Sequence, residues 1–69
     1  MATRTMQADV TVRNEGTIFL FTANTEIARA WISENVQEDA TYFGGSLVVE
    51  HRYAAVLVGG MTDDGLTLD

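Results

Sequence analysis

The sequence predicts an α+β fold: a small antiparallel sheet with two helices on one face, in the element order ββα-ββα. Two observations lead to this prediction. Short segments of β-branched and aromatic residues are separated by glycine-containing turns, a pattern typical of hairpins. A shift of thirty residues also places Asp9 on Asp39, Ile18 on Val48 and Ile27 on Leu57. The pattern of strand, turn, strand, helix and helix ending therefore occurs twice.

The length of 69 residues predicts a single domain. Domains this small have marginal cores and usually gain stability from disulfides, a metal or a partner chain. The chain has no cysteine, which excludes disulfides and thiolate metal sites. A second protein chain is therefore the expected source of additional stability.

The first hairpin is predicted within residues 8–23. Residues 1–7 show no periodicity and are expected to form a loose N-terminal segment. Val10 and Val12 alternate with polar neighbours, as in a half-buried strand. Gly16 suits a tight turn, and "TIFLFTA" then has the composition of a strand.

The first helix is predicted over "NTEIARAWISENV". Asn24 or Thr25 is expected to cap its first turn, and Asn35 to take the left-handed position after its last turn. The helical spacing predicts one apolar face, made of Ile27, Ala28, Trp31 and Ile32.

A second hairpin is predicted in "DATYFGGSLVV", with Gly44 and Gly45 at its turn. The next segment favours a helix from about His51, ending near Asp64, with Gly65 and Leu66 forming the ending. Its predicted apolar face is Tyr53, Val56, Leu57, Gly60 and Met61. For residues 53–58 a strand remains the alternative, since "AAVLV" also suits one. "LTLD" is then a short final strand or a tail.

No catalytic, metal or cofactor site is predicted. His51 is the only histidine, and no serine or cysteine forms a recognisable constellation with it. One histidine and no cysteine disfavour zinc, and the acidic runs do not match a calcium-binding loop. The glycine pairs match no phosphate-binding motif and are interpreted as a hairpin turn and close helix packing.

The charge is the most informative feature for function. Ten acidic residues stand against four arginines, with no lysine, which gives a net charge of −6. Such a surface repels nucleic acid and anionic lipid and attracts basic proteins, including those that bind nucleic acid. The same charge also provides solubility, which is the alternative interpretation.

Several of these acids fall at helix C-terminal ends, where carboxylates oppose the helix dipole and cost about 0.3–1 kcal/mol each. Folding gains nothing evident from this placement. It predicts a negatively charged partner-binding surface, called here the acidic patch. Its members are Glu34, Glu38, Asp39, Asp63 and Asp64.

Two stretches, "TVRNEGTIFLFTANTEIARAWISENV" and "SLVVEHRYAAVLVGGMTDDGL", resemble short uncharacterised proteins of bacterial genomes, plasmids and phages. Their motifs carry no known chemistry. In size and acidity the chain is also similar to anti-CRISPR proteins, which often occupy the DNA-binding surface of a CRISPR complex. That likeness implies a DNA-mimicking inhibitor and assigns no residue a role.

The resulting hypothesis is a small acidic interaction protein, not an enzyme, that blocks a basic nucleic-acid-binding protein and has no cofactor. The alternative is a homodimeric structural or accessory protein with no inhibitory role. A homodimer is expected in either case, because Ile18 and Leu20 point to one sheet face while Phe19 and Phe21 point to the other. With no signal sequence or membrane segment visible, the expected location is the cytoplasm.

Overall fold

A computed structural model of the chain describes residues 8–36 and 40–69. The elements are β1 (Val10–Asn14), β2 (Ile18–Ala23), α1 (Glu26–Asn35), β3 (Tyr42–Phe43), β4 (Ser46–Glu50) and α2 (His51–Asp63). The predicted α+β class and the ββα-ββα order are confirmed. Residues 53–58 are helical. The predictions for residues 1–7 and for Glu38 and Asp39 concern residues outside the described ranges.

The sheet has the order β1-β2-β4-β3, with antiparallel pairing throughout, so the two hairpins meet through their second strands. The thirty-residue correspondence is visible in this central pairing. Phe19 pairs with Val49, its own counterpart thirty residues later. In the same way, Ile18 and Glu50 form one pair, and their counterparts Val48 and Leu20 form another. The two halves are thus related by an approximate two-fold axis at the centre of the sheet.

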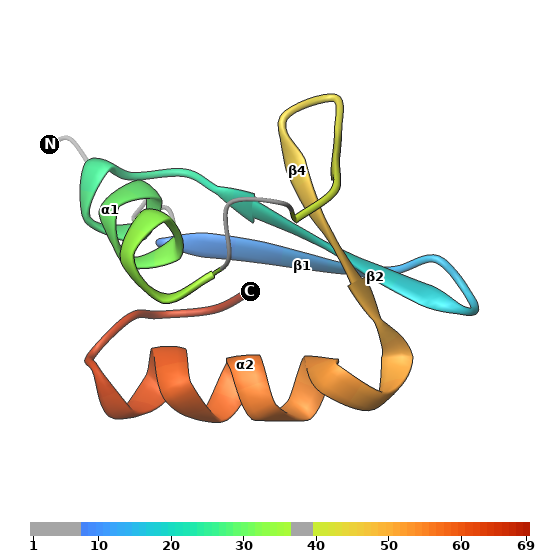
Figure 1. The fold of residues 1–69 in the computed structure, drawn as a ribbon. Helices are drawn as coiled ribbons and strands as arrows, with labels where there is room; N and C mark the ends of the chain where they lie inside the picture. Colours follow the sequence, from blue (N-terminus) through green and yellow to red (C-terminus); the bar gives the residue numbers. More distant parts are fainter. Residues whose placement is uncertain (1–7, 37–39) are drawn as a thin grey trace, which may run out of the picture.

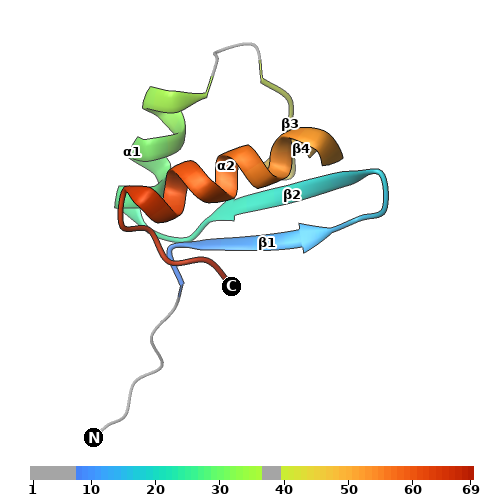
Figure 2. The ribbon, with the colours of Figure 1, turned by 90° about the horizontal axis from the view of Figure 1, so that it is seen from below.

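Both helices pack on the same face of the sheet. In Figure 1, α2 runs below the twisted sheet and α1 lies at its left end; from below, α2 crosses in front of the strands (Figure 2). The hydrophobic core lies between these layers, with Phe21, Leu47 and Met61 almost completely buried. Its other members are Val10, Ala28, Ile32, Val49, Ala54 and Leu66.

The other side of the sheet, called here the open face, has no helix over it within the described residues. Side chains alternate along a strand, and paired residues share a face, so the register defines its members. They are Thr11, Arg13, Ile18, Leu20, Thr22, Phe43, Ser46, Val48 and Glu50. The predicted separation of Ile18 and Leu20 from Phe19 and Phe21 follows from the same register.

Three glycines, at the predicted turn and the predicted helix ending, take the expected conformation. Gly44 and Gly45 have φ of 57° and 85°, as a two-residue hairpin turn with two positive φ values requires. Gly65 has φ of 90° and ends α2: its N–H bonds to Thr62 O, and the Leu66 N–H bonds to Met61 O. This is the Schellman arrangement, in which Leu66 folds back into the core.

The predicted ending of α1 is wrong. Asn35 is the last helical residue, and no non-glycine residue in the described ranges has a positive φ. Instead, the Asn35 side chain donates a hydrogen bond to Trp31 O at 2.9 Å, and the Val36 N–H bonds to Ile32 O. The Val36 N–H thus satisfies Ile32 O, one of the last four carbonyl groups of the helix, while the asparagine side chain bonds to the carbonyl group one residue earlier.

The predicted apolar helix faces are only partly right. Ala28, Ile32 and Met61 are buried, but the side chains of Ile27 and Val56 are 68% and 71% exposed. Tyr53 is also exposed. The inward face of α2 is rotated from the predicted one and consists of Ala54, Leu57, Val58 and Met61. The crossing of each helix over the sheet decides which part of a wide apolar stripe is covered.

The last three residues form a short parallel extension of the sheet beside β1. Val10 N–H bonds to Thr67 O at 3.0 Å, Asp69 N–H to Val10 O at 2.9 Å, and Val12 N–H to Asp69 O at 3.1 Å. Leu68 bridges to Val10. The segment "LTLD" therefore covers part of the β1 edge, which would otherwise present unpaired backbone groups.

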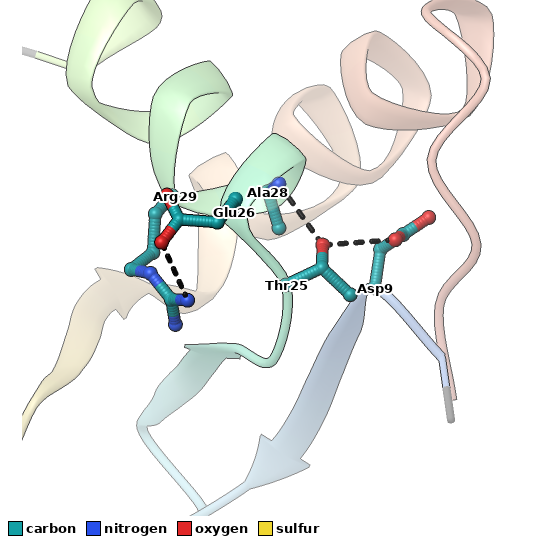
Figure 3. A network of polar contacts seen from close by, with 5 residues as sticks. All are labelled: Asp9, Thr25, Glu26, Ala28 and Arg29. Carbon is teal, nitrogen blue, oxygen red and sulfur yellow. Dashed lines mark hydrogen bonds and ion pairs between the residues drawn. The ribbon is translucent and has the colours of Figure 1, made fainter. Parts of the chain in front are cut away.

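Asp9 links the start of β1, the start of α1 and this C-terminal segment. Its carboxylate accepts hydrogen bonds from the Thr67 N–H at 3.0 Å and from the Thr25 hydroxyl at 2.9 Å. Thr25 in turn accepts from the Ala28 N–H and so caps α1, as Figure 3 shows. The bonds from Thr67 and Thr25 lower the pKa of Asp9 below its ordinary value of 3.8, although desolvation opposes them.

Asp9 is expected to make stability depend on pH in the acid range. Because its pKa is lower in the folded state, its contribution is present above about pH 4 and is lost as the pH falls through the lowered pKa. Asp9→Asn should lower the thermal midpoint at about pH 7, and the difference from the parent should shrink towards about pH 2. Glu34→Gln is the control and should shift the midpoint little. A constant Asp9→Asn deficit at all pH values would contradict this role.

Candidate partner-binding surface

The described members of the acidic patch lie at the C-terminal ends of the two helices. Glu34 is in the last turn of α1, Asp63 is the last residue of α2, and Asp64 follows it as the C-cap residue. All three side chains are exposed. The other two predicted members, Glu38 and Asp39, lie outside the described residues.

A contact between Trp31 and Asp64 brings these two helices together. The indole Nε1–H of Trp31 donates a hydrogen bond to the Asp64 carboxylate at 2.6 Å. The indole ring also covers Gly60, where an added Cβ would lie 3.3 Å from Trp31 Cζ2. Close helix packing at this glycine was predicted. Asp64 therefore has a structural partner, and the expectation that folding gains nothing from its position is wrong.

Each helix carries acidic side chains at its own C-terminal end. Glu34 follows Trp31 by three residues, one helical turn, while Asp63 and Asp64 are adjacent at the end of α2. Neither helix has a basic residue in its last turn. The partial negative charges of both helix C-termini therefore add to those of the carboxylates.

The arginines neutralise other parts of the surface. Each arginine in the described ranges forms an exposed ion pair with a glutamate close by in sequence. These pairs are Arg13–Glu15 at 3.5 Å, Arg29–Glu26 at 3.4 Å and Arg52–Glu50 at 3.3 Å. Among the described residues, none of these pairs involves Glu34, Asp63 or Asp64. In residues 8–36 and 40–69, the carboxylates outside these pairs are therefore those at the helix ends, Glu34, Asp63 and Asp64, together with Asp9 and Asp69.

His51 begins α2 and lies on a different part of the surface. Its imidazole is exposed and packs against the Phe19 ring, with ring centres 4.9 Å apart and the planes tilted by 51°. It borders an open hollow whose other lining residues are apolar: Val12, Phe19, Ala54, Ala55 and Val58. In the part of the chain that the structure describes, no hydrogen bond holds the imidazole in a catalytic orientation.

The larger surface hollows are mainly apolar. One of about 460 Å³ lies between the end of α1, β4 and α2, with Val36, Leu47, Val49 and Leu57 in its lining. Its polar lining residues are Asn35, Glu50 and Tyr53. Residues 8–36 and 40–69 contain no group of three or more histidine, aspartate or glutamate side chains placed to hold a metal ion.

Comparison with protein-family models, with curated proteins and with solved structures found no match to this chain. Neither helix in the described ranges is long and apolar enough to cross a membrane.

Proposed function

We propose that this protein binds a basic nucleic-acid-binding protein through the acidic patch and thereby excludes that partner's nucleic acid. The class of inhibitor is the one that the anti-CRISPR resemblance implies: a small acidic domain that acts as a DNA mimic. It performs no chemistry of its own. The single observation that carries the proposal is the uncompensated charge at the ends of α1 and α2.

The charge at the helix ends can attract a basic partner protein. The carboxylates of Glu34 and Asp63 are exposed and are joined by the negative ends of two helix dipoles. Basic grooves that hold phosphates attract such a surface over long range, which accelerates association and makes binding sensitive to salt. The same surface repels nucleic acid, so we expect the protein itself to bind neither DNA nor RNA.

The test is a displacement assay with a matched pair of charge variants. Purified CRISPR effector complexes and other basic nucleic-acid-binding proteins are each loaded with labelled nucleic acid, and release is measured as this protein is added. Glu34→Gln/Asp63→Asn should weaken displacement by about tenfold or more, mainly through slower association. Asp64 is left unchanged because it holds Trp31.

The control is Glu15→Gln/Glu26→Gln, which removes two carboxylates from glutamates that are paired with arginines. Both double variants raise the net charge from −6 to −4. The control should displace nucleic acid within about threefold of the parent, since exposed ion pairs contribute little. Equal losses in the two variants would show that only net charge matters. Failure to displace nucleic acid from any partner in the panel would refute the inhibitor function.

A second candidate function is a structural or accessory role as a homodimer, with the charge serving solubility. The open face favours it, because apolar side chains there have no covering element among the described residues. The two candidates differ in one outcome: an accessory homodimer keeps its role when Glu34 and Asp63 are neutralised.

A further inference from the structure

The open face has an apolar centre that water still reaches. Leu20 lies on the central strand β2, with Ile18 beside it along the strand and Val48 opposite it on β4. All three side chains are only half-buried, and Phe43 at one end of the face is 72% exposed. These neighbouring apolar side chains form a candidate interaction surface.

The polar side chains of the same face are compatible with burial. The hydroxyl groups of Thr22 and Ser46 face each other across β2 and β4 and are hydrogen-bonded at 2.6 Å. Each hydroxyl therefore keeps a partner when water is removed, so covering the face leaves neither group unsatisfied.

The charge of the open face differs from that of the whole chain. Its two charged members, Arg13 and Glu50, cancel, whereas the chain carries −6. Arg13 on β1 is paired with Leu20 on β2, and Glu50 on β4 is paired with Ile18 on β2. The two charges therefore lie on opposite sides of β2. Their present partners, Glu15 and Arg52, form exposed ion pairs that contribute little and can be exchanged.

We propose that the open face binds the open face of a second copy of this chain, about a two-fold axis parallel to β2. Such an axis exchanges the β1 and β4 sides. Arg13 of each copy then lies on the side where the other copy presents Glu50. Two acidic copies repel each other elsewhere, and a neutral, self-complementary face is where they meet with least repulsion. A basic partner is drawn instead to Glu34, Asp63 and Asp64, which lie on the helices and remain uncovered in this dimer.

The size of the face sets the expected strength of the dimer. Strand spacings give three five-residue strands a projected area of roughly 250 Å². Standard interfaces bury about 800 Å² of accessible surface on each partner. The dimer should therefore be weak, with a dissociation constant on the order of micromolar or above.

Sedimentation equilibrium of the purified chain tests the proposal directly. From about 1 µM to about 1 mM, the mass should rise from 7.5 kDa towards twice that value. Leu20→Lys should remain a monomer throughout, and its circular dichroism should show a retained fold, because the lysine stem can lie along the sheet. Ile27→Lys, an equal charge change at an exposed position of α1, should dimerise like the parent. A parent monomer at all concentrations, or dissociation by Ile27→Lys as well, would overturn the proposal.

A charge exchange tests the two-fold arrangement. Arg13→Glu and Glu50→Arg should each weaken the dimer by about tenfold, and the double variant should return to within about threefold of the parent. A double variant weaker than both single variants would rule out this axis. These measurements need no partner protein and do not rest on the proposed function. Leu20→Lys, which keeps Glu34 and Asp63, can lose the dimer and still displace nucleic acid.

Discussion

Replacing Phe21 with alanine should leave the domain largely unfolded at 25 °C. Phe21 lies on the central strand β2, has no exposed side-chain surface and joins residues of both helices in the core. Truncation of a buried phenylalanine costs about 3–5 kcal/mol in the free energy of unfolding. A domain of this length has a total of roughly 3–10 kcal/mol, and small domains lie towards the lower end. Urea denaturation followed by circular dichroism measures the loss.

Phe43→Ala is the matched control for this prediction. Phe43 is also on a strand but is 72% exposed, so its removal should change the free energy of unfolding by less than about 0.5 kcal/mol. Measurement at low micromolar concentration keeps self-association from contributing. A Phe21→Ala variant as stable as Phe43→Ala would mean that the core does not form between the sheet and the two helices.

Gly60→Leu should destabilise the protein by about 1–5 kcal/mol. Even a Cβ at this position lies 3.3 Å from the Trp31 ring, so a larger side chain must displace the indole. Overpacking of this kind costs about 1–3 kcal/mol. Displacement of the indole also breaks the hydrogen bond from Trp31 to Asp64, a further loss of about 1–3 kcal/mol because the acceptor is charged. The higher helix propensity of leucine compared with glycine offsets about 1 kcal/mol of this loss.

Gly59→Leu gives the opposite result from the neighbouring position. Gly59 is exposed, and an added Cβ there meets no atom within 4 Å. Only the gain in helix propensity applies, so stability should rise by about 0.5–1 kcal/mol. Trp31 is the only tryptophan, and its fluorescence should change in Gly60→Leu but not in Gly59→Leu. Equal effects at the two positions would show that Trp31 does not pack on Gly60.

Features that depend on neighbouring residues were predictable from the sequence. The turn at Gly44 and Gly45 and the ending of α2 at Gly65 each need a positive φ, which glycine adopts without steric cost. The cap of α1 by Thr25 also depends on residues within one turn. Repetition of such local signals along the chain was sufficient to predict the ββα-ββα order.

The inward faces of the helices required the tertiary structure. Both helices have apolar stripes that are wider than the sheet can cover. Helical spacing alone therefore allows Ile27 and Val56 a core position as readily as Ala28 and Ala54, although only the two alanines are buried. Asn35 shows the same limit: its local preference for a left-handed position gave way to a hydrogen bond with Trp31 O inside the helix.

The features of the candidate site also separate into those that the sequence predicts and those that depend on the tertiary structure. The sequence by itself determined that the protein is acidic and that carboxylates lie at the C-terminal ends of both helices, because charge and helix periodicity are properties of the chain. Only the tertiary structure decided that Asp64 meets Trp31, that Asp9 holds the C-terminal segment, and that the open face is neutral. These contacts join residues 33 and 58 positions apart in the sequence. No local pattern encodes such pairings, because they exist only once the layers have packed.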